Sequence, residues 1–152
     1  KKINSKIVIT GDSQTSSQIG DISKFKGIDL ITPTETEARR FITNSSVGLA
    51  AISKEILSKL NLKNLIITLN KNGVLIDTKR NTDKINSLAN VVQDTAGAGD
   101  AFLSYVSLAL ATKANIWESS YLGSVASAIH VNNIGNEKID FEVVRDFINN
   151  IE

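Results

Sequence analysis

The sequence predicts an α/β fold, in which a sheet of buried strands lies between layers of helices. Two observations predict this class. Short apolar runs bounded by polar or glycine residues recur through the first part of the chain, as expected of buried strands. Segments with apolar residues at helical spacing lie between these runs and after them. At 152 residues the chain is long enough for a single domain with its own hydrophobic core.

Strands are predicted where the apolar runs are shortest and most continuous. These runs are residues 7–10, 30–31, 65–69 and 73–77. Residues 70–72 form the tight connection between the last two strands. A polar loop with a helical turn near residues 21–25 is expected over 13–26, and a charged loop over 79–84. Residues 85–92 are expected to be extended and to lead the chain to Asp94.

Helices are predicted from capping signals and from the spacing of apolar residues. The first helix begins with Thr32 as N-cap and Pro33 as its first residue, Glu35 closes a capping box, and the helix ends near Ile42. The other helices are residues 48–61, 99–111, 117–132 and 141–151. Apolar residues cover several faces of segment 99–111, which predicts a helix buried nearly all round.

The composition of the chain indicates which binding partners and which cellular compartment to expect. Hydrophobic residues make up 41% and charged residues 22% of the chain, and the net charge of +1 gives no electrostatic case for nucleic acid or an anionic membrane. No apolar run approaches the roughly 20 residues of a membrane span, and residues 1–6 lack the apolar core of a signal peptide. Cys is absent, so cytoplasm is expected. Met is absent too, which suggests a piece of a longer protein.

The strongest candidate for chemistry is the string Asp94-Thr-Ala-Gly-Ala-Gly-Asp100-Ala-Phe102. Gly97 and Gly99 allow the backbone to approach a bulky ligand closely. The helix that follows directs its N-terminal N–H groups and the positive end of its dipole to the same point, which favours a phosphate. Asp100 would repel that phosphate, but its carboxylate can take a proton from a hydroxyl that attacks the phosphorus.

Other readings of this string are weaker. A glycine-rich turn often does no more than join a strand to a helix. The sequence contains no G-x-x-x-x-G-K-[ST] of a P-loop enzyme and no G-x-S-x-G of a hydrolase. Phe102 stands where a dinucleotide-binding fingerprint requires a third glycine.

The whole string closely resembles the signature of the ribokinase-like sugar kinases, the pfkB carbohydrate kinase family. The resemblance implies a three-layer α/β/α domain that transfers the γ-phosphoryl group of ATP to a hydroxyl of a sugar or sugar phosphate. It gives Asp100 the role of general base, and the N–H groups of Gly97, Ala98 and Gly99 the role of anion hole. Within the family, the run resembles the branch with heptose-phosphate kinases most.

The resemblance covers nearly the whole chain, but only the second, nucleotide-binding half of a typical family member. The first half of such a member carries the lid and most of the sugar contacts. The isolated chain is therefore expected to phosphorylate no sugar. A homodimer is possible for the full-length protein.

Residues 31–38 resemble the family's T-P-N-x-x-E segment, whose Glu organises Mg²⁺ and the transferring phosphate. By that match Glu37 is the metal-site candidate, and the alternative is a solvated carboxylate in the first turn of a helix. Thr34 stands where most members have Asn. Its hydroxyl can still bind a phosphate or a metal-bound water, although it has a shorter reach than an amide.

Residues 68–73 resemble the family's T-x-G-x-x-G turn, which contacts the ribose and phosphates of the nucleotide. The match proposes Thr68, Asn70 and Gly73 as nucleotide-binding residues. Asn70 replaces the first glycine, and Asn tolerates the left-handed backbone region better than most residues. A simple hairpin uses the same residue types.

Gly123 and residues 127–136 resemble the family segment that lines the adenine pocket. Asp94 matches a position that in many members helps to bind a K⁺-like ion, and a turn-capping role is the alternative. His130 is the only His, so it makes no zinc site, and it is expected to be a packed or half-exposed helix residue.

Two other classes of function remain open. In one, the departures at Thr34 and Asn70 have removed catalysis and left a nucleotide-binding regulatory domain. In the other, the string only supports the fold, and the chain is an interaction module.

Overall fold

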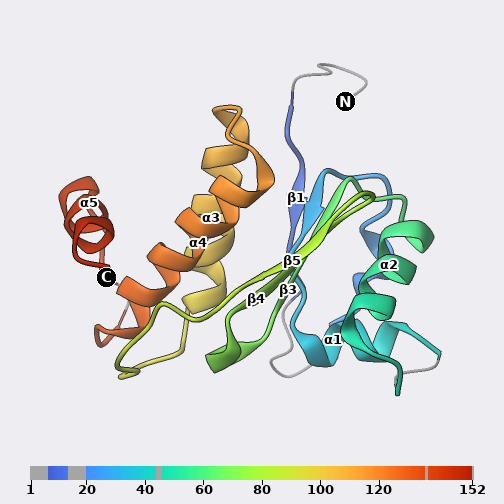
Figure 1. The fold of residues 1–152 in the computed structure, drawn as a ribbon, viewed down its shortest axis with the longest axis horizontal. Helices are drawn as coiled ribbons and strands as arrows, with labels where there is room; N and C mark the ends of the chain where they lie inside the picture. Colours follow the sequence, from blue (N-terminus) through green and yellow to red (C-terminus); the bar gives the residue numbers. More distant parts are fainter. Residues whose placement is uncertain (1–6, 14–19, 44–45, 136, 152) are drawn as a thin grey trace. The chain divides into compact units, whose positions relative to one another are not determined.

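The computed structural model describes residues 7–13, 20–43, 46–135 and 137–151, and Figure 1 shows its ribbon. The chain forms two compact units, Lys1–Ile85 and Asn86–Glu152, which we call the sheet unit and the helical unit. The part of the chain that the structure describes contains no helix long and apolar enough to cross a membrane. The combination of a mixed sheet with helices confirms the α/β class.

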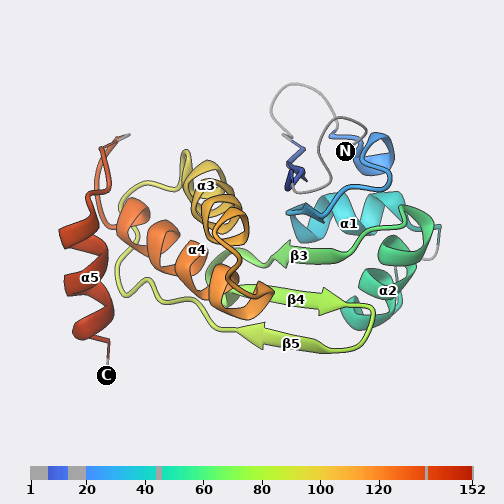
Figure 2. The same ribbon diagram turned by 90° about the horizontal axis from the view of Figure 1, so that it is seen from above.

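The sheet unit is built on a five-stranded sheet in the order β1-β2-β3-β4-β5. Its strands are β1 Thr10–Gly11, β2 Leu30–Ile31, β3 Asn64–Thr68, β4 Val74–Thr78 and β5 Thr82–Ile85. The first three strands run parallel, with Leu30 opposite both Thr10 and Asn64. Strand β4 runs antiparallel to both of its neighbours, β3 and β5, as the arrows show in Figure 2. The carboxyl ends of β1, β2 and β3 therefore meet at one edge of the sheet.

Helices pack on this sheet to form the core of the unit. They are α1 Glu35–Phe41 and α2 Leu49–Lys59, with short 3₁₀ turns η1 Ile22–Lys24 and η2 Asn70–Asn72. The core joins apolar side chains of α2 to those of the strands, among them Ile52, Ile56, Ile31, Leu65 and Ile67. Ile52 and Ile56 are two of the residues whose spacing predicted α2, and both are fully buried.

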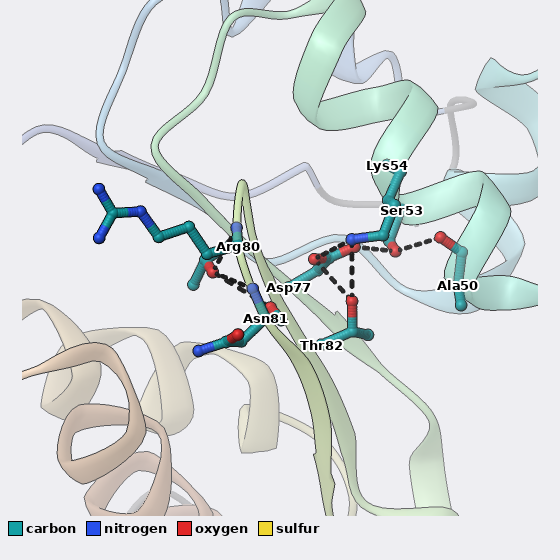
Figure 3. A network of polar contacts seen from close by, with 8 residues as sticks. Ala50, Ser53, Lys54, Asp77, Arg80, Asn81 and Thr82 are labelled. Carbon is teal, nitrogen blue, oxygen red and sulfur yellow. Dashed lines mark hydrogen bonds and ion pairs between the residues drawn. The ribbon is translucent and has the colours of Figure 1, made fainter.

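A buried carboxylate also holds α2 against the sheet (Figure 3). Asp77 of β4 is fully buried and accepts hydrogen bonds from the hydroxyls of Ser53 on α2 and Thr82 on β5. The Lys54 ammonium lies 3.4 Å from the Oδ1 atom of Asp77, the same oxygen that accepts from Thr82. A buried charge is tolerated only when it is paired and hydrogen-bonded, and these contacts meet that condition.

The helical unit contains α3 Ala98–Ala111, α4 Ile116–Val131 and α5 Phe141–Asn149. Helices α3 and α4 lie side by side in Figures 1 and 2. Gly123 makes this close approach possible. A Cβ at position 123 would lie 2.5 Å from the Val106 Cγ2 atom and 3.0 Å from the Phe102 carbonyl oxygen. The Tyr105 hydroxyl donates to the Ile139 carbonyl at 2.9 Å and so ties α3 to the segment before α5.

Several predicted elements need correction. The first strand is Thr10–Gly11 and not residues 7–10, and Ile7 is exposed. Residues 82–84, which we expected in a charged loop, belong to β5 and pair with β4. Helix α3 is not buried all round, because Leu108 is 64% exposed whereas Phe102, Val106 and Ala109 are buried.

The start of α1 was also predicted two residues too early. Thr34, and not Thr32, is the N-cap, and Glu37, and not Glu35, closes the capping box. Both Thr32 and Thr34 have a Glu three residues later, so the motif alone allows either start. The pairing with β3 decides between them. Thr68 N–H donates to the Pro33 carbonyl at 2.9 Å, which keeps the chain extended through Pro33 and delays the helix.

Candidate functional site

In the sheet unit, two of the predicted nucleotide-binding residues lie side by side. Thr34 and Thr68 form a parallel bridge that extends the pairing of β2 and β3 beyond the strands themselves. This bridge brings the start of α1 against the carboxyl end of β3. Ligands of open α/β sheets bind outside the carboxyl ends of parallel strands, so the position suits a binding site.

Glu37 lies at the same edge and is held in place by Thr34. One carboxylate oxygen, Oε2, accepts hydrogen bonds from the Thr34 N–H and the Thr34 hydroxyl, both at 2.8 Å. The Glu37 N–H in turn donates to the Thr34 Oγ1 atom at 3.3 Å. Glu37 is only 2% exposed. It is therefore not the solvated first-turn carboxylate that we considered as the alternative.

The turn after β3 has the backbone conformation that its sequence suggested. Asn70 has a φ of 50° and Gly73 a φ of 86°, so both have the positive φ that glycine adopts most easily. The turn is closed by a hydrogen bond of 2.8 Å from the Leu69 N–H to the Gly73 carbonyl. Asn70 therefore adopts a conformation that glycine tolerates best, and its exposed side chain lies two residues after Thr68.

Asp12 is a further carboxylate at this edge, and the sequence reading assigned it only to a loop. Asp12 follows β1, and its Oδ1 atom lies 3.3 Å from the Thr32 hydroxyl that donates to it. One signal was available in the sequence. A carboxylate after a buried parallel strand lies at the same sheet edge as the residues that follow the neighbouring strand.

The oxygen atoms at this edge fit a hard divalent cation such as Mg²⁺. Mg²⁺ is usually bound through one or two carboxylates, several waters and the phosphates of a substrate. Among the described residues, no group of three or more His, Cys, Asp or Glu residues could hold a metal ion without such help. A metal role for Glu37 therefore stays a prediction.

In the helical unit, the predicted phosphate turn opens α3. Gly97 is the N-cap of the helix, with a φ of 82°. The Ala98 N–H donates to the Thr95 carbonyl at 3.3 Å. Among the described residues, no hydrogen bond uses the N–H group of Gly97 or of Gly99. Both groups are therefore available to an anion, and they lie at the positive end of the α3 dipole.

Asp100 lies in the first turn of α3 and is exposed. Its carboxylate is thus on the same helix turn as the N–H groups of Gly97 and Gly99. A group that takes a proton from a reacting hydroxyl must be within hydrogen-bond reach of a substrate, and an exposed position permits this.

Asp94 accepts a hydrogen bond from the Ala96 N–H at 2.9 Å and so caps the turn. This contact fits the turn-capping alternative, whereas a cation role for Asp94 stays a prediction. Gly123 is explained by the packing of α3 on α4, and its contact with a nucleotide also stays a prediction. Of the predicted adenine segment, Asn136 lies outside the described residues.

His130 is packed, as expected, and is 6% exposed. Its ring Nε2 atom lies 2.6 Å from the Ala96 carbonyl oxygen, so it contacts the residue directly before Gly97. No local pattern predicts this contact, because the two residues lie 34 positions apart.

Comparison of the chain with known proteins identifies its family. The model of the pfkB family carbohydrate kinases matches residues 4–139. The chain is 30% identical over 131 residues to the bifunctional protein HldE of Campylobacter curvus, covering 84% of this chain and 28% of that protein. It is 26% identical to an uncharacterized sugar kinase of Buchnera aphidicola, covering 85% of this chain and 42% of that protein.

Solved structures of similar fold agree with this result. Ribokinase from Thermotoga maritima has a TM-score of 0.76 at 27% identity, over 83% of this chain and 44% of that one. Ribokinase from Arabidopsis thaliana, solved with ribose and ATP, has a TM-score of 0.80 at 21% identity, over 93% and 47%. The chain spans less than half the length of each of these relatives. It belongs to the pfkB family of carbohydrate kinases and has the ribokinase-like α/β fold.

Proposed function

We propose that this chain is the nucleotide-binding and catalytic half of an ATP-dependent carbohydrate kinase, and that its two units together form one kinase domain. One observation carries the proposal. The family's signature string opens α3 with an exposed carboxylate, Asp100, on the same turn as the available N–H groups of Gly97 and Gly99.

Asp100 is the general base in this proposal. It takes the proton of the acceptor hydroxyl as the oxygen of that hydroxyl attacks the γ-phosphorus of ATP, and ADP leaves. The N–H groups of Gly97, Ala98 and Gly99 bind the oxygens of the transferring phosphoryl group, where negative charge must be stabilised. The Ala98 N–H contributes least, because it also donates to Thr95.

The sheet unit holds the nucleotide. Thr68, Asn70 and Gly73 lie on the turn after β3 and contact the ribose and phosphates of ATP, and Thr34 lies beside Thr68. Gly123 lines the adenine pocket by resemblance, and Asp94 serves a K⁺ ion. Glu37 would hold Mg²⁺ or a water bound to it, and Asp12 would support the metal from the neighbouring strand end. The metal would supply positive charge that offsets the charge of the phosphates.

A heptose phosphate is the proposed acceptor, because the sequence resembles that branch of the family and HldE proteins recur among its relatives. Membership of a kinase family favours catalysis over a purely regulatory domain or an interaction module. The cytoplasm, where ATP is supplied, is the proposed location.

The test uses the full-length protein with ATP, Mg²⁺ and a panel of acceptors that includes heptose phosphates, hexose phosphates and ribose. ADP release and the phosphorylated product are measured together, the latter by ³¹P NMR. We expect ADP release that depends on one acceptor class. ADP release equal to the acceptor-free background with every acceptor would contradict the proposal.

A further inference from the structure

Helix α4 is bound at its C-terminal turn to the segment that leads into the phosphate turn, residues 93–96, which we call the approach segment. The N–H groups of Gln93 and Asp94 both donate to the Val131 carbonyl, at 2.7 and 3.3 Å. His130 then contacts the Ala96 carbonyl oxygen through its ring Nε2 atom at 2.6 Å. The approach segment is thus attached to α4 at its start through backbone contacts and at its end through one side chain.

The contact with the Ala96 carbonyl determines which nitrogen of the His130 ring carries the proton. A carbonyl oxygen only accepts hydrogen bonds, so the Nε2 atom of His130 must carry the proton and donate it. His130 is 6% exposed, and water has little access with which to replace this bond. The Ala96 N–H is also taken, because it donates to the Asp94 carboxylate at 2.9 Å. Both polar backbone groups of Ala96 are therefore fixed.

The position of the Ala96 carbonyl determines where the next N–H group points. The Ala96 carbonyl and the Gly97 N–H belong to one planar trans peptide, so they point in opposite directions. Gly97 itself restricts the orientation of this peptide plane little, because glycine adopts positive and negative φ about equally well. Hydrogen bonds around Gly97 therefore set its observed φ of 82°, and within the turn and helix these run from the Ala98 N–H to the Thr95 carbonyl and from the Ala101 N–H to the Gly97 carbonyl. His130 adds a contact from another helix, and this contact acts on the Ala96–Gly97 peptide itself.

We propose that His130 is a positioning residue for the anion hole: it holds the Ala96 carbonyl and thereby aims the Gly97 N–H at the phosphoryl group. The proposal rests on the proposed kinase function for the identity of the anion. Its structural part, that the His130 donor fixes the orientation of the Gly97 N–H, stands on the contacts of the helical unit alone. His130 touches neither substrate nor nucleotide in this role.

The test compares His130→Leu with His130→Gln in the full-length protein. Leu fills similar space without a donor, whereas the side-chain amide of Gln places an N–H near the position of the ring Nε2. Ser120→Ala is the matched control, because the buried Ser120 hydroxyl donates only to the Ile116 carbonyl of the same helix and does not reach the turn. Urea unfolding of each variant separates loss of stability from loss of activity.

In the kinetic measurement, removal of an oxyanion-hole donor costs about 10²–10³ in kcat in known enzymes. His130→Leu leaves the donor present but free to turn away, so we expect a smaller loss in kcat of about 10-fold or more. The KM for ATP should change little, and His130→Gln should recover most of the rate. Equal kcat for wild type, His130→Leu and Ser120→Ala would overturn the positioning role.

NMR of the same proteins gives a readout that needs no activity. In the spectrum of the full-length wild type, the His130 ring should show the Nε2–H tautomer. The amide signal of Gly97 should shift in His130→Leu and return to its wild-type position in His130→Gln. An unchanged Gly97 signal in His130→Leu would overturn the proposal even if the wild type phosphorylates sugars. If the wild type phosphorylates none, the proposed function fails, and the Gly97 signal still decides whether His130 orients the turn.

Discussion

The sheet unit and the helical unit present their candidate groups in different ways. In the sheet unit the groups are side chains, and Thr34 and Glu37 hold each other in a capping box at the carboxyl edge of the strands. In the helical unit they are mainly backbone N–H groups, and contacts with α4 fix the turn that carries them. A short sequence motif can therefore encode a site made of side chains. A site made of backbone N–H groups also depends on packing against an element that is distant in the sequence.

The largest effect on stability is expected where the helical unit depends on close packing. Gly123→Ala places a Cβ 2.5 Å from the Val106 side chain and 3.0 Å from the Phe102 carbonyl oxygen, so α3 and α4 must move apart. We expect the free energy of unfolding in urea to fall by about 1–3 kcal/mol. Gly99→Ala is the control, since a Cβ there meets no described atom within 4 Å. Equal stability of the two variants would contradict the packing role of Gly123.

The sheet unit should respond to changes of side-chain chemistry at Glu37. Glu37→Gln keeps an acceptor for the Thr34 donors, so the fold should persist while the Mg²⁺ concentration for half-maximal activity rises about 10-fold or more. Glu37→Ala keeps the Thr34 cap but removes the carboxylate that accepts from the Thr34 N–H and hydroxyl, which should cost about 1–3 kcal/mol of stability.

Glu35 provides the control for this pair of variants. Its carboxylate makes a partly exposed ion pair of 2.8 Å with Arg39, and such pairs contribute about 0–1 kcal/mol. Glu35→Gln should therefore change neither the Mg²⁺ requirement nor stability by much. A Mg²⁺ requirement that is the same in Glu37→Gln and wild type would remove Glu37 from the metal site.

A smaller effect is expected where each unit has a non-glycine residue in the left-handed region. Lys113, after the end of α3, has a φ of 74°, and Asn70 has a φ of 50°. Lys113→Gly should raise the free energy of unfolding by up to about 1 kcal/mol, because the left-handed conformation costs a Lys about 1–2 kcal/mol and glycine nothing. Asn70→Gly should gain less, since Asn tolerates this region. Thermal unfolding of the two variants checks the order.

The smallest effect is expected at Thr34. Asn is as good an N-cap as Thr, so Thr34→Asn should keep α1 intact. Its amide reaches further toward a bound phosphate or a metal-bound water than the Thr34 hydroxyl does. We expect a modestly lower apparent Mg²⁺ requirement or faster turnover in the full-length enzyme. Unchanged values of both would place Thr34 outside the phosphate and metal shell.

The sequence predicted the features that local patterns encode. Strand β2, the apolar face of α2 and the turn at Asn70 were all found where periodicity and turn residues placed them. The start of α1 was missed because two overlapping capping motifs compete, and only the pairing of Pro33 with Thr68 distinguishes them. The contact of His130 with Ala96 could not be predicted from the sequence, since it depends on how α4 packs beside the turn.

The same limit applies to Gly123. A resemblance assigned it to the adenine pocket, but its neighbours are Val106 and Phe102 of α3. A single sequence does not distinguish a glycine that a ligand requires from one that a neighbouring helix requires. The distances to a Cβ built at position 123 show that the neighbouring helix requires glycine there, and a contact with the nucleotide stays a prediction.

The most direct test of the account is the turnover of Asp100→Asn in the full-length protein, measured beside its affinity for ADP. Asn has nearly the same shape as Asp but accepts no proton at neutral pH. Because Asp100 is exposed in the first turn of α3, the fold and the ADP affinity should be retained. The account predicts a loss of about 10²–10⁴ in turnover with an unchanged Kd for ADP. Turnover within about 10-fold of wild type would contradict the assignment of Asp100 as the base.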